Sequence, residues 1–99
     1  MNIHKDELLN LINVSIDDTN LLLEKSLNLD NVEIHDKNCF ENLDSLGIVN
    51  LLYNIENNFQ KTYHIKVNIL NDSFYDDPMS HLVSVESLIS FIESCINNE

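Results

Sequence analysis

Two segments of the chain repeat one spacing of apolar residues, and this spacing constrains the fold more than any other feature. In each segment the apolar residues fall at positions i, i+3, i+4, i+7 and i+11, which places them on one side of an α-helix. The two sets are Ile48, Leu51, Leu52, Ile55 and Phe59, and Val85, Leu88, Ile89, Ile92 and Ile96. We therefore expect amphipathic helices over about 45–59 and 85–95, the second with Ser84 as its N-cap.

The N-terminal third has a weaker pattern that allows two interpretations. Clusters of leucine and isoleucine at 8–12 and 22–27 indicate two helices. Between them lie residues that commonly cap helices, Ser15, Asp17, Asp18 and Thr19. One longer helix over about 5–27 fits nearly as well. We expect residues 1–20 to be an N-terminal extension or an extra helix.

The remaining segments predict loops and one short helix. Residues 28–42 are polar, and we expect a loop that is held to the core by Val32, Ile34 and Phe40. Apolar residues alternate over 63–69, which predicts an extended stretch. Asp77 as N-cap and Pro78 at the first helical position predict a short helix over 79–82. The whole chain, residues 1–99, is thus expected to be one small all-α domain.

The charge of the chain limits its partners. Asp and Glu number 17 against five lysines, and the net charge is −12. Nucleic acids and anionic membranes bind cationic surfaces, so we expect neither as a partner. The partners expected are proteins with positive charge. No segment approaches the roughly 18 apolar residues of a membrane span, and Lys5, Asp6 and Glu7 interrupt any signal-like run. We therefore expect a cytoplasmic monomer.

The most informative residue for function is Ser45, where the loop meets the helix predicted over 45–59. Asp44 and Ser45 are ordinary capping residues, and Asp-Ser-Leu alone is short enough to occur by chance. The longer run Asp44-Ser45-Leu46-Gly47-Ile48-Val49-Asn50-Leu51-Leu52, however, resembles the acyl and peptidyl carrier protein family. The run over 84–92 is similar to the last helix of that family. Gly47 is nearest to D-alanyl and peptidyl carriers, which favours an aminoacyl cargo.

The resemblance implies a fold, a cofactor and a set of partners. The fold is a four-helix carrier-protein-like bundle, here with a long, partly extended connection before the short third helix. A phosphopantetheinyl transferase would attach 4′-phosphopantetheine from coenzyme A to Ser45. The thiol of this arm would hold an acyl or aminoacyl group as a thioester, which a loading ligase supplies and downstream biosynthetic enzymes use. The protein would have no catalytic residue of its own.

The resemblance also indicates which residues are recognised. Asp44, Leu46, Val49 and Glu56 are the expected contacts of the transferase or other partners. The second helix of the family is usually rich in acids, whereas here Asn50, Asn54, Asn57 and Asn58 take most of its polar positions. We therefore expect a recognition face with many asparagines, on which shape and apolar contacts count for more than charge.

Other chemistries have less support in the sequence. The four histidines are scattered without zinc-site spacing, and residues 71–77 lack the glycine and final glutamate of a calcium loop, so we expect a turn there and no metal site. Ser45 also lacks the Gly-x-Ser-x-Gly frame of a hydrolase. Two alternatives stay open: an acidic interaction module that has lost its arm, and a small serine hydrolase that uses Ser45 and a histidine.

Overall fold

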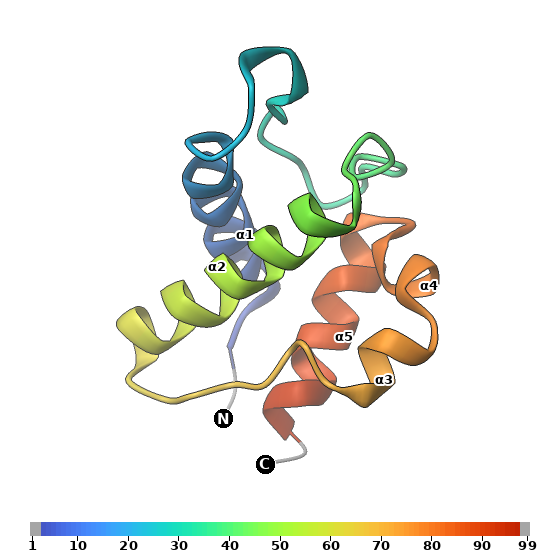
Figure 1. The fold of residues 1–99 in the computed structure, drawn as a ribbon. Coiled ribbons are helices and arrows are strands. Elements are labelled where there is room, and N and C mark those ends of the chain that lie inside the picture. The colour runs from blue at the N-terminus through green and yellow to red at the C-terminus, as the bar shows by residue number, and fades with distance from the viewer. Residues whose placement is uncertain (1–2, 98–99) are drawn as a thin grey trace.

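Helices make up most of the computed structural model, which describes residues 3–97 (Figure 1). The longer ones are α1 (Lys5–Asn20), α2 (Ser45–Tyr63) and α5 (Val85–Asn97). The short ones are the 3₁₀ turn η1 (Lys25–Leu27), α3 (Asp72–Asp76) and α4 (Pro78–Leu82). Within residues 3–97 there is no strand, only an isolated bridge between Lys37 and Ser84. The expected all-α class is confirmed.

The core forms where the apolar sides of the long helices meet. Helix α1 lies along α2, and α5 packs against α1 and α4. In Figure 1, α3 and α4 lie beside α5. The fully buried side chains include Ile12, Leu52, Ile55, Phe59 and Leu88, and each contributes roughly 1.5–3 kcal/mol through burial. The two predicted amphipathic helices are therefore confirmed, and both extend a few residues beyond their predicted ends.

Helix α1 corrects the predictions for the N-terminal third. It ends at Asn20, so one helix over 5–27 is wrong, and the apolar cluster at 22–27 forms only η1. The proposed capping residues lie inside α1. The hydroxyls of Ser15 and Thr19 donate to the carbonyls of Leu11 and Ser15 at 2.8 and 2.7 Å, which satisfies them without ending the helix. Within the predicted 1–20 segment, residues 5–20 form a helix that contributes side chains to the core.

Two asparagines of α1 hold the first half of the loop that leads to α2. The Asn13 amide accepts from the backbone nitrogen of Val32 at 2.7 Å and donates to its carbonyl at 2.9 Å. The Asn20 amide bonds Leu29 in the same two ways. Val32 and Phe40 are buried as predicted, whereas Ile34 is half-buried. The loop is thus fixed to the helix that precedes it.

The connection after α2 is extended but contains an unpredicted helix. His64, at a φ of 58°, ends α2 in the left-handed conformation. Val67 and Ile69 of the next stretch are buried. Asn71 then accepts from the Phe74 nitrogen at 3.0 Å and begins α3, where the sequence predicted only a turn. The helix predicted over 79–82 is confirmed as α4, so this part of the chain has two short helices in place of one.

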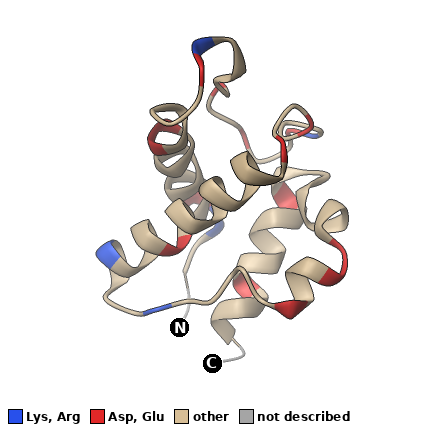
Figure 2. Ribbon diagram, viewed as in Figure 1, with Lys and Arg blue, Asp and Glu red and all other residues tan. Residues whose placement is uncertain are grey.

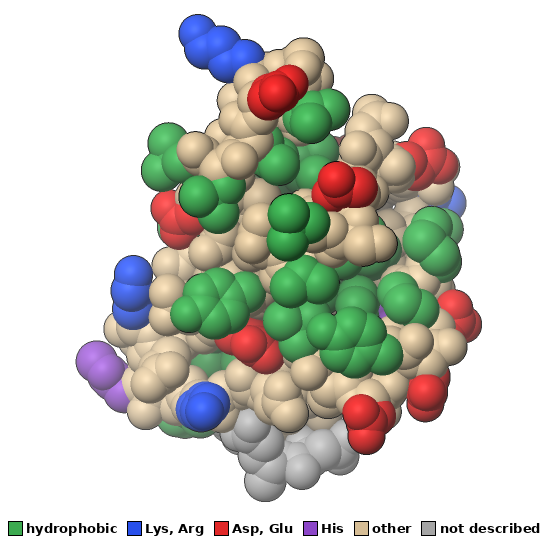
Figure 3. All heavy atoms as spheres, viewed as in Figure 1, with side chains coloured by type: hydrophobic (Ala, Val, Ile, Leu, Met, Phe, Trp, Pro, Cys, Tyr) green, Lys and Arg blue, Asp and Glu red, His purple; other side chains and the backbone are tan. Residues whose placement is uncertain are grey.

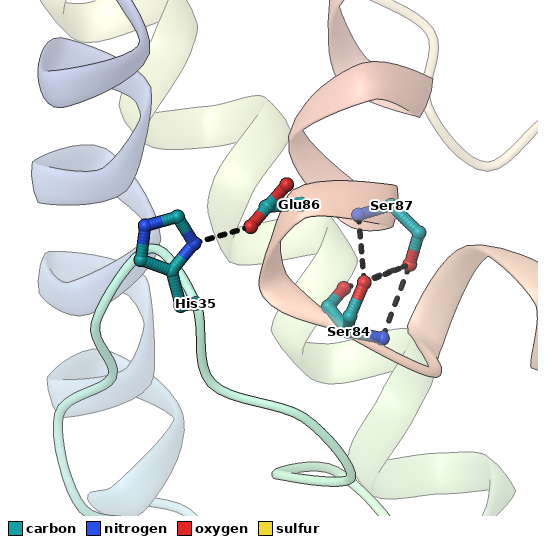
Figure 4. A network of polar contacts seen from close by, with 4 residues as sticks. All are labelled: His35, Ser84, Glu86 and Ser87. Carbon is teal, nitrogen blue, oxygen red and sulfur yellow. Dashed lines mark hydrogen bonds and ion pairs between the residues drawn. The ribbon is translucent and has the colours of Figure 1, made fainter.

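The start of α5 is joined to the loop before α2. The Ser87 nitrogen donates to the Ser84 Oγ at 3.0 Å, and the Ser84 nitrogen donates to the Ser87 Oγ at 3.1 Å, which confirms Ser84 as a cap (Figure 4). His35 bonds Glu86 next to this cap. The Asn38 nitrogen also donates to the Val83 carbonyl at 2.9 Å. These bonds fix the loop that ends at Ser45.

Candidate functional site

Ser45 is the first residue of α2, and its side chain is exposed. Asp44 precedes it as the N-cap, with its Oδ1 accepting from the Gly47 nitrogen at 2.8 Å. This cap satisfies one of the N–H groups at the helix start, and the N–H groups of Ser45 and Leu46 have no intrahelical acceptor. Ser45 therefore presents a hydroxyl beside free N–H groups, at the positive end of the helix dipole.

Gly47 has a packing role at this helix start. A Cβ on Gly47 would lie 3.1 Å from the Cδ2 of Leu43 and 3.3 Å from the Oδ1 of Asp44. Any larger side chain would push against the capping carboxylate and against Leu43, which is buried. The close approach of Leu43 and Asp44 thus accounts for glycine at this position without reference to a cargo.

Apolar side chains surround the helix start. Leu46, next to Ser45, is 68% exposed. Val49, one turn later, is half-buried. A small pocket of about 80 Å³ opens between the loop, α2 and α4, with mostly apolar residues lining it, among them Leu43, Ile48, Met79 and Leu82. This pocket has room for only a few carbon atoms.

Glu56 differs from the other predicted recognition residues, because its carboxylate has partners within the chain. Glu56 Oε2 accepts from the backbone nitrogen of Ile69 at 2.6 Å and from that of Leu70 at 3.1 Å. A carboxylate that accepts two N–H groups forms charge-assisted hydrogen bonds. Glu56 therefore holds the connection between α2 and α3 against α2, a role that its place in the sequence did not reveal.

The asparagines of α2 also correct a prediction. Asn54 Nδ2 donates to the hydroxyl of Thr19 at 2.9 Å, and Asn58 Nδ2 donates to Ser15 Oγ and Asp18 Oδ2, both at 3.0 Å. These two side chains face α1, so the expected recognition face of four asparagines is wrong. Sequence reasoning missed this pairing, although Ser15 and Thr19 continue the apolar stripe of α1 and thereby indicate a buried polar contact.

The histidines and the cysteine near this end of the molecule have other surroundings. His81 stacks on Phe91, with ring centroids 4.0 Å apart, and His35 pairs with Glu86. No histidine within residues 3–97 hydrogen-bonds to Ser45. Burial raises the pKa of the Cys39 thiol, and the Asp36 carboxylate raises it further. These neighbours do not prepare Ser45 or Cys39 as a nucleophile.

The described residues form neither a metal site nor a membrane span. Among residues 3–97, no three His, Cys, Asp or Glu side chains lie close enough together to hold a metal ion. Every helix in that range falls short of the length and apolar character that crossing a membrane requires.

Comparisons of the chain with protein-family models, with curated proteins and with solved structures find no match.

Proposed function

We propose that the protein is a free-standing acyl or aminoacyl carrier with 4′-phosphopantetheine on Ser45. The observation that carries the proposal is the position of Ser45, an exposed hydroxyl at the capped start of α2. A hydroxyl there is open to a transferase, and no neighbouring side chain has to move for the arm to extend into solvent.

The electrostatics of the helix start favour a phosphodiester at this position. The chain has a net charge of −12, which opposes the addition of another negative group. The free N–H groups and the helix dipole at Ser45 offset this repulsion locally. In the reaction, Ser45 Oγ forms a bond to phosphorus, and the bond from that phosphorus to the nucleotide part of coenzyme A breaks. The Ser45 proton leaves to a base of the transferase.

The remaining partners follow from this chemistry. A ligase would load the thiol of the arm, and biosynthetic enzymes would act on the thioester. The protein would supply tethering rather than catalysis, because an attached intermediate meets each enzyme at a high effective concentration. The proposed location of this work is the cytoplasm.

Two other functions make different predictions. An interaction module without the arm would keep the surface of α2 and leave Ser45 unmodified. A serine hydrolase would need a base at Ser45, and the histidines described above bond elsewhere. Among residues 3–97 no histidine is positioned as a base at Ser45, so the carrier is better supported than the hydrolase.

The test is the intact mass of the purified protein after incubation with coenzyme A and phosphopantetheinyl transferases of broad specificity. We expect a single phosphopantetheine adduct that Ser45→Ala abolishes. Ser90→Ala is the matched control, since Ser90 is an exposed serine of α5 and its loss should leave the adduct unchanged. An unmodified mass with every transferase contradicts the carrier and favours the interaction module. Ester hydrolysis that Ser45→Ala removes would favour the hydrolase.

A further inference from the structure

A second pocket, of about 340 Å³, lies between the first half of α1 and the last turns of α2. Polar and apolar side chains of both helices line it, among them Glu7, Leu11 and Val14 of α1 and Asn58 and Tyr63 of α2. The face over α2, α3 and α4, by contrast, gathers mainly hydrophobic side chains (Figure 3). Small-molecule pockets measure roughly 300–1,000 Å³ and combine apolar walls with a few polar groups. We call this one the α1–α2 pocket.

Glu7 and Tyr63 place a carboxylate beside an aromatic ring in the lining of the pocket. Tyr63 Oη donates to Glu7 Oε2 at 3.3 Å. The Tyr63 ring packs against Phe59, with ring centroids 4.8 Å apart, which fixes its position. Burial raises the pKa of the Tyr63 hydroxyl, and the Glu7 carboxylate raises it further. The phenol therefore stays protonated and neutral, and the negative charge of this pair lies on Glu7.

The carboxylate of Glu7 has no cationic partner within residues 3–97, where the one ion pair joins His35 and Glu86. Lys5 and Lys61 are close to lining residues in the sequence, but neither lines the pocket. Figure 2 shows the lysines at helix ends and in the connections between the longer helices. A ligand in the α1–α2 pocket therefore meets a negative charge that the lining itself does not neutralise.

Asn58 adds a hydrogen-bond acceptor from the α2 side of the pocket. Its Nδ2 donates to Ser15 Oγ and Asp18 Oδ2, both at 3.0 Å, which fixes the amide group. Its Oδ1 accepts no hydrogen bond from another described residue. Buried side-chain oxygens of the described residues all have partners, so the Asn58 Oδ1 is open to solvent. This oxygen is thus free to accept from a ligand.

These groups together favour one class of ligand. A carboxylate and an amide oxygen accept N–H groups, and a tyrosine ring attracts a cation. An anion would meet the charge of Glu7 without a cation in the lining. A bare metal ion would lack ligands, since no three His, Cys, Asp or Glu side chains of residues 3–97 come together. Leu11 and Val14 favour a cation that also has an aliphatic chain.

We propose that the α1–α2 pocket binds a small primary alkylammonium ion. The ammonium group lies at Glu7 and Asn58, beside the Tyr63 ring, and the aliphatic chain contacts Leu11 and Val14. Asn58 is roughly 20 Å along α2 from Ser45. Binding here therefore does not require the phosphopantetheine arm, and it can hold or fail independently of the carrier function.

The test is an NMR titration of the ¹⁵N-labelled protein with n-butylammonium chloride at constant ionic strength. We expect saturable shifts of the amide signals of the lining residues. The dissociation constant should be on the order of 10 mM, because the ligand is small and Glu7 is exposed. n-Butanol and butyrate keep the aliphatic chain without the cation, so both should bind at least about fivefold more weakly.

Glu7→Gln removes the charge and should weaken n-butylammonium binding about fivefold, as expected for a single exposed ion pair. Asp6→Asn is the matched control, because Asp6 is an exposed acid of the same helical turn that does not line the pocket. Its binding should stay within about twofold of that of the natural chain. Val14→Ser should weaken n-butylammonium more than methylammonium, which has no chain to lie on Val14.

Three results would overturn the proposal. Equal weakening in Glu7→Gln and Asp6→Asn would mean that binding depends on net charge alone. Binding of n-butanol as tight as that of n-butylammonium would mean that the pocket does not recognise the cation. Shifts that do not saturate, or that centre on residues outside the lining, would mean that the pocket is not the binding site.

Discussion

The two sides of helix α2 use residue types in an unusual way. The side toward the core and α1 buries Ile55 and Phe59, but it also contains Asn54 and Asn58, which hydrogen-bond to α1. The opposite side exposes Leu46 and Tyr53. On α2, polarity therefore does not identify the outer side, because asparagines stabilise the fold while apolar residues are available for contact.

The largest difference in stability is expected between variants of two aromatic residues on opposite sides of α2, Phe59 and Tyr53. Phe59→Ala should lower the free energy of unfolding by about 3–5 kcal/mol, since Phe59 is fully buried. Tyr53→Ala should change it by less than about 0.5 kcal/mol, since Tyr53 is more than half exposed. Urea denaturation measures both values. Similar losses in the two variants would contradict the division of α2 into an inner and an outer side.

Glu56 tests whether an acid of α2 serves the fold or the partner. Glu56→Ala removes the acceptor of two backbone N–H groups and should cost about 1.5–3 kcal/mol of stability. Glu56→Gln keeps an acceptor oxygen and should cost less. Denaturation is measured for the natural chain, Glu56→Ala and Glu56→Gln, and so is the rate at which Ser45 of each folded protein is modified. Together these values separate a role in stability from a role in recognition. If the Glu56 variants have normal stability but are modified slowly, Glu56 is a recognition residue rather than a structural one.

Neighbouring asparagines provide a finer version of the same comparison. Asn58 bonds Ser15 and Asp18, whereas the side chain of Asn57 is exposed. Asn58→Ala should therefore cost roughly 1–2 kcal/mol, and Asn57→Ala should stay within about 0.5 kcal/mol. Thermal unfolding is sufficient to measure this difference. An equal cost in the two variants would mean that the bonds of Asn58 to α1 add nothing to stability.

Apart from the exposed controls Tyr53 and Asn57, Asp44 should give the smallest loss of stability, and it separates capping from charge. Asp44→Ala removes the bond to Gly47 and should cost about 1 kcal/mol, whereas Asp44→Asn keeps a good N-cap without the charge. If the transferase reads the carboxylate, both variants should be modified more slowly although only Asp44→Ala is less stable. Modification of Asp44→Asn at the natural rate would assign Asp44 to capping alone.

Much of the fold could be predicted because the relevant signals are local. The spacing of apolar residues located α2 and α5. The N-cap Ser84 and the proline Pro78, at the first helical position, located the starts of α5 and α4. Helix α3 was missed because five residues are too few to show a period, although Asn71 is a good N-cap.

The candidate site could be predicted only in part. The place of Ser45 at the helix start was correct, since Asp44 caps locally. The inward asparagines and the bonds of Glu56 join segments that are 13 or more positions apart, so no local pattern revealed them. The approach of Leu43 to Gly47 likewise depends on how the loop packs on the helix.

The most direct test of the central claim locates the modification within the chain. Cleavage after lysine releases residues 38–61, in which Ser45 is the only serine. The protein is first incubated with coenzyme A and a transferase. It is then reduced, which removes any pantetheine that is bound to Cys39 through a disulfide. The peptide is finally fragmented in a mass spectrometer. The carrier account predicts one phosphopantetheine on Ser45. An unmodified 38–61 peptide, or an arm on any other residue, would contradict it.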